Sequence, residues 1–288
     1  MKYVSITNGG MLAATAALLF RNGIDVEDRD IAIGMEAPYL FAFQSDRYCA
    51  GKALYTPSYL NNYLVPKGFS LNLESLPRAE AIQRMTDNEA VVLPLRIQTQ
   101  IIHPVLFTDY DHCAFHFDNI KMKISPEPDT LVLTKQMLQH RLSERVSLYT
   151  LKRCEPTPFN PIPILVESLD TLDQFYFDIR AWYRKKIYPD ALIKLRHTHL
   201  DPLLKHMSPL MLLAGDMQLH RIMKELYHHL THVGYLQEGP SEYLDDYVPW
   251  PYLKVVIHGI REIIFDRFYA LGVSDEFIDS RAKLIAPE

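Results

Sequence analysis

A proline-rich segment near the middle of the chain places the strongest constraint on the fold. Residues 155–163, with the sequence EPTPFNPIP, contain four prolines. Because proline fixes φ and lacks a backbone N–H, this segment must be extended and cannot continue a helix or a central strand. We therefore expect a first domain at residues 1–155, a proline-rich linker at 156–163 and a second domain at 164–288.

Charge and composition exclude several classes of protein. The 288 residues include 30 Lys and Arg against 35 Asp and Glu, and the net charge of −5 is spread along the chain. Because there is no basic field to attract phosphates, nucleic acid is not an expected partner. The hydrophobic fraction of 48% and the aromatic fraction of 11% suffice for a large core, which excludes a disordered chain.

The cysteines and the apolar runs indicate where such a chain would work. Cys49, Cys113 and Cys154 are odd in number and lack C-x-x-C spacing, so neither a disulfide framework nor a zinc-thiolate site is expected. The longest stretch that is apolar apart from one threonine, Met11–Phe20, has about half the length needed to cross a bilayer, and no convincing small-x-small cleavage site follows it. We expect a cytoplasmic protein with no membrane partner.

The first domain begins with helical patterns and continues with strand patterns. Thr7 or Asn8 is a suitable N-cap for an Ala- and Leu-rich helix over 11–21, which Gly23 would end. The following residues predict helices over 28–35, 56–65 and 77–85, a strand over 68–73, and an ordered surface loop over 38–52. From residue 90 we expect one helix, 135–142, and strands over 91–97, 103–110, 114–117, 130–134 and 146–152. This order predicts an α+β domain.

Beyond the linker the sequence predicts helices only. The expected segments are 168–188, 192–206, 209–234, 242–246, 251–271 and 274–284. The stretch 175–188 is rich in aromatic residues and is interpreted, with Trp250, as part of a helical core. The second domain is therefore expected to be all-α.

Two motifs of the first domain resemble papain-like proteins. The strand HPVLFTDYD, which begins at His103, and the strand FHFDN, which contains Asp118, resemble the histidine strand and the strand that ends in an orienting aspartate. The turn and helix over 8–23 resemble the segment that presents a cysteine nucleophile. Over roughly its first 155 residues the chain thus resembles the bacterial double-glycine-leader peptidases and the N-terminal domain of butirosin biosynthesis protein H.

The resemblance implies a papain-like α+β domain that is followed, as in the butirosin-type proteins, by a helical domain. In these families the helix N-terminus lowers the cysteine pKa, the histidine deprotonates the thiol, and the carboxylate orients the imidazole. His103 and Asp118 would be the histidine and the carboxylate, and they would face each other across neighbouring strands.

The chain departs from this pattern at the nucleophile. Counting back from Gly23, the cysteine should fall at Gly10, which has no side chain, and residues 1–7 contain no Gln or Asn for the oxyanion. A glycine pair at a helix N-terminus can still offer backbone N–H groups to an anion or a carbonyl. The expected ligand-binding residues are therefore Asn8, Gly9, Gly10 and Met11.

Other interpretations of the reactive side chains stay open. His103 is alternatively a half-buried strand histidine bonded to a neighbour. Cys113 falls in the turn of the same hairpin, too far from the start of the His103 strand to serve it. Cys49 could act as a relocated thiol if its loop folds back over the site, and its alternative is a structural or merely exposed cysteine.

Histidines in the second domain form pairs at helical spacing. Asp216 with His220, and His228 with His232, would each share one helix face and could hold a metal together. No Glu-x-x-His pair recurs on partner helices. We expect a solvated helix surface, no metal and no cofactor.

The leading hypothesis is a cytoplasmic bacterial pseudoenzyme with a papain-like fold. It would bind a peptide, an acyl-carrier protein or a small natural-product intermediate in the former active site, in a pathway of secondary metabolism. One alternative is an acyltransferase or amide hydrolase in which His103 and Asp118 serve a substrate nucleophile directly. Another is a structural interaction module whose helical half mediates assembly. The sequence does not define the substrate or the oligomeric state, and a homo-oligomer is one of the possible states.

Overall fold

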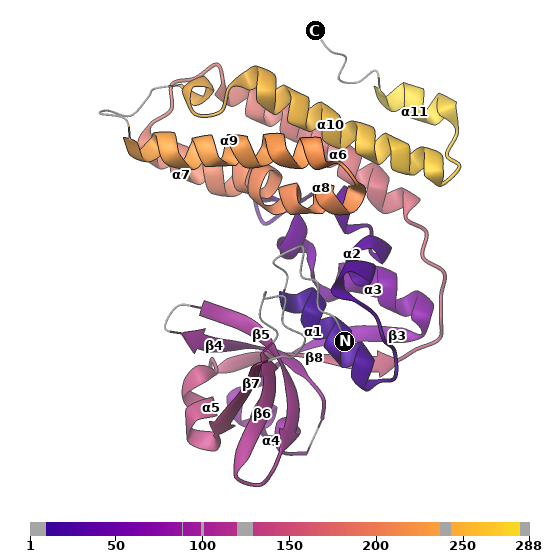
Figure 1. The fold of residues 1–288 in the computed structure, drawn as a ribbon, viewed down its shortest axis with the longest axis vertical. Coiled ribbons are helices and arrows are strands. Elements are labelled where there is room, and N and C mark those ends of the chain that lie inside the picture. Colours follow the sequence, from indigo (N-terminus) through magenta and orange to yellow (C-terminus); the bar gives the residue numbers. More distant parts are fainter. Residues whose placement is uncertain (1–9, 88, 99–100, 120–128, 237–242, 283–288) are drawn as a thin grey trace. The chain divides into compact units, whose positions relative to one another are not determined.

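The chain folds into two compact units (Figure 1). A computed structural model describes residues 10–87, 89–98, 101–119, 129–236 and 243–282. The first unit comprises Met1–Met35 and Tyr55–Phe159, and the second comprises Glu36–Leu54 and Asn160–Glu288. The later boundary falls inside the proline-rich segment. The expected contiguous domain over 1–155 differs from this division, because residues 36–54 belong with the helices of the second unit.

The first unit is an α+β structure built on an antiparallel sheet. Its six strands are ordered β3-β8-β4-β5-β6-β7, and each neighbouring pair is antiparallel. The strands are β3 (Phe69–Pro77), β4 (Val92–Gln98), β5 (Ile101–Tyr110), β6 (Ala114–Asn119), β7 (Asp129–Thr134) and β8 (Arg145–Arg153). The six strands predicted from residue 68 onward therefore all appear, with ends displaced by a few residues. A strand-like pattern over residues 2–6 lies outside the described residues.

Helices cover both faces of this sheet. On one face, α4 (Arg78–Thr86) and α5 (Lys135–Arg141) pack on a core that includes Leu93, Val105 and Phe117. Since successive side chains of a strand point to opposite faces, Leu106 and Asp118 lie on the other face, where α1 (Gly10–Arg21) packs against β5. The helices α2 (Asp28–Gly34) and α3 (Pro57–Leu64) complete the unit.

The second unit is mainly helical. Its helices are α6 (Ile162–Trp182), α7 (Pro189–Leu195), α8 (Ser208–Ala214), α9 (Met217–Leu236), α10 (Trp250–Ala270) and α11 (Asp275–Ala282), with a π-helical segment η4 (Arg196–Met207). The helix expected over 209–234 is interrupted at Gly215, whose φ of 89° ends α8. An all-α second domain was expected, and the unit also contains a two-stranded sheet because residues 36–54 join it.

Residues 36–54 are not the surface loop that the sequence suggested. They form η1 (Ala37–Tyr39), the hairpin β1 (Ala42–Gln44) and β2 (Arg47–Cys49), and η2 (Gly51–Leu54). Phe41 is fully buried, its N–H donates to Ser168 Oγ at 3.2 Å, and its ring packs edge-on against Phe175 at 5.5 Å. Phe41 and Tyr48 of this segment are core residues, because the helix residues on which they pack lie more than a hundred positions later in the chain.

A bidentate ion pair holds the start of this segment. Arg267 on α10 donates from Nε to Glu36 Oε2 at 2.8 Å and from Nη2 to Oε1 at 2.5 Å. Glu36 is buried and has a left-handed backbone with φ of 64°, which non-glycine residues seldom adopt. The ion pair supplies a contact that stabilises this unfavourable conformation.

Candidate functional site

The sequence pattern of α1 explains why its first residue lies against the sheet. Eight successive residues from Leu12 to Leu19 are buried, so the helix is held along most of its length. Gly23 ends it with φ of 82°: its N–H donates to Phe20 O, and the N–H of Ile24 donates to Leu19 O. The predicted N-cap candidates Thr7 and Asn8 lie outside the described residues.

Gly10, the first residue of α1, lies directly against His103 on β5. A Cβ atom built on Gly10 would be 2.6 Å from His103 Cε1, 3.1 Å from Nε2 of the same ring and 3.0 Å from Pro104 Cγ. Contacts shorter than about 3 Å do not occur for real Cβ atoms, so the imidazole occupies the space of a side chain at position 10. The structure thus brings together the two positions that the sequence assigned to nucleophile and base.

Asp118 does not face His103 as the sequence suggested. Its partner across the β5–β6 ladder is Leu106, and Phe117 pairs with Phe107. His103 lies three residues from Leu106, which corresponds to about 10 Å along a strand. The predicted hairpin is present, but the spacing of 15 residues does not place the carboxylate beside the imidazole. The hairpin turns after Tyr110, which pairs with Phe115, and counting back along both strands from this pair brings Asp118 opposite Leu106 rather than His103.

The electrostatic partner of Asp118 lies at the other end of α1. Burial raises the pKa of the Asp118 carboxyl, and the positive charge of Arg21 opposes that rise. The Arg21 guanidinium is anchored by donating to Phe107 O at 3.0 Å and to Thr108 O at 2.6 Å. Asp118 is therefore associated with the C-terminal residue of α1, whereas His103 touches its N-terminal residue.

The remaining predicted ligand-binding residues are only partly described. Asn8 and Gly9 lie outside the described residues. Met11, the second residue of α1, is half-buried. Of the four residues expected to bind a ligand, the structure therefore describes Gly10 and Met11.

The three cysteines, which were considered as a source of the missing thiol, differ in exposure. Cys49, the candidate relocated thiol, is on β2 of the second unit and is 3% exposed. Cys113 is exposed in the β5–β6 turn, and Cys154 is half-buried. A buried thiol is a poor nucleophile, so Cys49 is better explained as a core residue of the β1–β2 hairpin.

The histidine pairs considered for a metal have other partners. Asp216 Oδ1 accepts the N–H of Leu219 at 2.8 Å and so caps α9, while His220 Nδ1 lies 2.9 Å from Ser208 O. The exposed side chains of His228 and His232 lie against each other, with ring centroids 3.8 Å apart and ring planes inclined at 34°. Among the described residues, no group of three or more His, Cys, Asp or Glu side chains is arranged to hold a metal ion.

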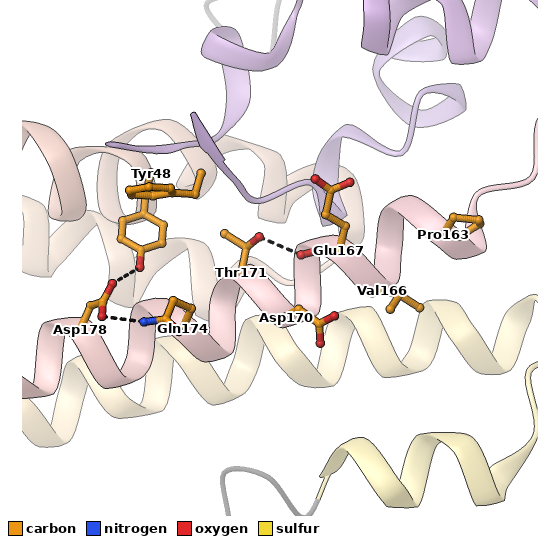
Figure 2. A pocket seen from close by; sticks show the side chains of 9 residues that line it. Tyr48, Pro163, Val166, Glu167, Asp170, Thr171, Gln174 and Asp178 are labelled. Carbon is orange, nitrogen blue, oxygen red and sulfur yellow. Dashed lines mark hydrogen bonds between the residues drawn. The ribbon is translucent and has the colours of Figure 1, made fainter. Parts of the chain in front are cut away.

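One further cluster was not apparent from the sequence. In the second unit, Tyr48 from the β1–β2 hairpin donates its hydroxyl to Asp178 Oδ2 on α6 at 2.6 Å, and Gln174 donates to Oδ1 at 2.7 Å (Figure 2). Tyr48 and Asp178 are 130 residues apart, and no local pattern connects them.

Comparisons with known proteins add no assignment to this geometry. No protein-family model matches the chain, and no curated protein matches it. Within the described residues, none of the helices combines the length and apolar character that spanning a membrane would require.

Proposed function

We propose that the chain is a catalytically degenerate papain-like protein that binds an acyl group, carried as a thioester or as part of a peptide, at the N-terminus of α1. The contact between Gly10 and His103 supports this proposal. The two residues lie next to each other as a nucleophile and its general base would, but Gly10 has no side chain that could attack a substrate. The papain-like ancestry rests on the motifs around His103 and Asp118.

The contact also suggests how the ligand would be held. A helix N-terminus presents backbone N–H groups and a partial positive charge, both of which favour a carbonyl oxygen or a carboxylate. The imidazole of His103 stands beside these groups and can donate a further hydrogen bond. Without a thiol, no covalent acyl intermediate forms, so the site would bind the acyl group without transferring it.

The position of Asp118 favours binding over catalysis. In a working triad the carboxylate keeps the imidazole in the correct tautomer and stabilises its charged form. Here Asp118 pairs across the ladder with Leu106 and interacts with Arg21, so it does not support a basic His103 in that way.

A small thioester tests this proposal. We would add an aminoacyl thioester of N-acetylcysteamine to the full chain, follow binding by ligand-observed NMR, and follow thioester loss and acyl adducts by mass spectrometry. We expect binding to the wild type that weakens about tenfold or more in His103→Ala, since one hydrogen bond to the acyl oxygen is lost. We expect no adduct and no thioester loss above the buffer rate.

Three results would contradict the proposal. Wild-type transfer of the acyl group to an added primary amine, lost in His103→Ala, would show that His103 accepts the amine proton as the thiolate leaves, and the chain would be an acyltransferase. Binding unchanged in His103→Ala would place the ligand elsewhere. Absence of binding would favour an interaction module without this site. Thr108→Val serves as a control on the same strand.

A further inference from the structure

A groove with a cavity volume of about 570 Å³ follows α6 in the second unit. Figure 2 shows Asp178, Gln174, Thr171 and Glu167 following one another along α6, with the Tyr48 ring beside Asp178. The groove is lined by Phe43, Tyr48, Pro163, Val166, Glu167, Asp170, Thr171, Gln174 and Asp178. It lies wholly within one unit, so its properties do not depend on the chemistry proposed at Gly10.

The carboxylates at the two ends of the groove are far apart but aligned. Glu167 and Asp178 are separated by three turns of α6, so they share one side of the helix at a distance of about 16 Å along its axis. Thr171 and Gln174 lie between them on the same side. The groove therefore suits an extended ligand that carries, near each end, a group able to interact with a carboxylate.

The charge of the groove is only partly balanced. Of the described residues that line it, none is Lys, Arg or His, while three carry carboxylates. Asp170 is paired with Arg281 of α11, which shows that this side of α6 accepts a cationic group. Asp178 receives hydrogen bonds from two donors that carry no charge, Tyr48 and Gln174, so it is fixed in position without an ion-pair partner in either of these bonds.

His199, which packs against Tyr48, does not supply a positive charge beside Asp178. The ring of His199 packs edge-on to Tyr48 with centroids 5.0 Å apart. Burial lowers the pKa of His199 despite the opposing effect of Asp178, so the imidazole is neutral at physiological pH. The groove consequently keeps a net negative charge at its Asp178 end.

Apolar and aromatic groups complete the groove between and beside its carboxylates. Phe43 is 54% exposed and packs edge-on to Tyr48 at 4.9 Å, and Pro163 and Val166 line the wall near Glu167. Methylene groups can pack on such a wall, and an aromatic face attracts a protonated amine. Carboxylates with exposed aromatic and aliphatic neighbours indicate a cation that carries an apolar chain.

We propose that this groove binds a linear aliphatic polyamine, with its terminal ammonium groups at Glu167 and Asp178 and its methylene chain along Phe43 and Val166. Spermine is the probe of choice, because its terminal nitrogens, when extended, span a length comparable to the separation of the two carboxylates. Putrescine has the same end groups on a chain too short to reach both.

Isothermal titration calorimetry on the full chain tests this proposal. We expect one spermine per chain, binding that weakens as salt is raised, and putrescine at least tenfold weaker than spermine. Glu167→Gln and Asp178→Asn should each weaken spermine about tenfold, since each removes one charge-assisted contact. Glu262→Gln, which removes an exposed carboxylate of α10 outside the groove, should leave the affinity unchanged.

The variants also separate a folding defect from a binding defect. Asn at position 178 can still accept from Tyr48, and circular dichroism and thermal unfolding check that it does so without loss of structure. If Asp178→Asn unfolds, Glu167→Gln and Phe43→Leu, which change exposed side chains, decide the result. No spermine binding, equal affinity for putrescine, an unchanged affinity in Glu167→Gln, or an equal loss in Glu262→Gln would each overturn the proposal.

Discussion

The imidazole of His103 fills the space in which a side chain at position 10 would begin, with Cε1 only 2.6 Å from the place of a Cβ on Gly10. We predict that Gly10→Ala destabilises the protein by about 1–3 kcal/mol, because the ring must move out of a packed position. The combined change Gly10→Ala with His103→Ala should recover most of that loss. Guanidinium unfolding of the two single variants and the double variant measures this coupling.

Gly259 offers a matched control for this prediction. The three atoms nearest to a Cβ there all belong to the Leu219 side chain, with Cδ1 at 3.0 Å, and a leucine end can turn away. Gly259→Ala should therefore be neutral or stabilising, as expected for alanine inside a helix. Equal stability of Gly10→Ala and wild type would show that His103 moves freely and that the contact is not a packing constraint.

Asp28 on α2 should make stability depend on pH. It is 1% exposed, its Oδ2 has no hydrogen-bond partner among the described residues, and burial raises its pKa to about 6. The folded protein therefore holds a proton on Asp28 that the unfolded chain has lost between about pH 4 and pH 6, so stability rises as the pH falls through 6. At pH 7 and above, the buried charge destabilises the fold.

Replacement by a neutral amide tests this effect of Asp28. Asp28→Asn should stabilise the protein by about 2 kcal/mol at pH 7.5, with the gain disappearing near pH 4. Urea unfolding at a series of pH values measures it. Asp25→Asn, at an exposed site close by, should show no such trend. A constant difference between wild type and Asp28→Asn across the pH range would contradict the assignment of the titration to this group.

The Glu36–Arg267 ion pair should be strongly coupled. Glu36 is 4% exposed, so removing its partner by Arg267→Met leaves a buried charge, and we expect a loss of about 2 kcal/mol or more. Glu36→Gln should also destabilise, and the double variant should lose less than the sum of the single losses. Guanidinium unfolding of the wild type, the two single variants and the double variant gives the free energies of unfolding for this double-mutant cycle. Additive losses would mean that the pair contributes nothing beyond its separate side chains.

Cysteine labelling should follow burial. Cys113 is exposed, Cys154 half-buried and Cys49 buried, so maleimide should modify Cys113 first and Cys49 only on unfolding. Peptide mass spectrometry gives the order, with guanidinium-unfolded protein as the control in which all three react. Labelling of native Cys49 as fast as Cys113 would restore it as a candidate reactive thiol.

Much of the first unit follows from local sequence. The apolar run before Gly23 gives α1, the alternating strands give β5 and β6, and Thr134 caps α5 by accepting the N–H of Met137. The ladder register does not follow from these signals, because the shift between Phe107 and Asp109 depends on packing rather than on residue counts. Asp118 lies opposite Leu106 and not His103 because the turn follows Tyr110, which pairs with Phe115, whereas a pairing of His103 with Asp118 would require a turn centred between Tyr110 and Asp111.

The second unit was predictable only where its contacts are local. Its long helices were expected, but the predicted helix over 192–206 is divided between the end of α7 and η4, a π-helix with Pro202 inside it. Residues 36–54 were misinterpreted because Phe41, Tyr48 and Glu36 obtain their partners from α6 and α10. The groove on α6 was missed for the same reason, since its aromatic wall and its carboxylates come from distant segments.

The origin of residues 36–54 has a consequence for how the chain is made. During synthesis these residues emerge early, but Ser168, Asp178 and Arg267, which bind them, emerge only after the whole sheet of the first unit has been translated. A fragment ending at residue 155 would carry Phe41 and Tyr48 without Phe175 and Asp178, their partners on α6. A fragment starting at residue 160 would lack the hairpin that fills its core. The two units are thus compact in space but cannot be separated by a single cut in the chain.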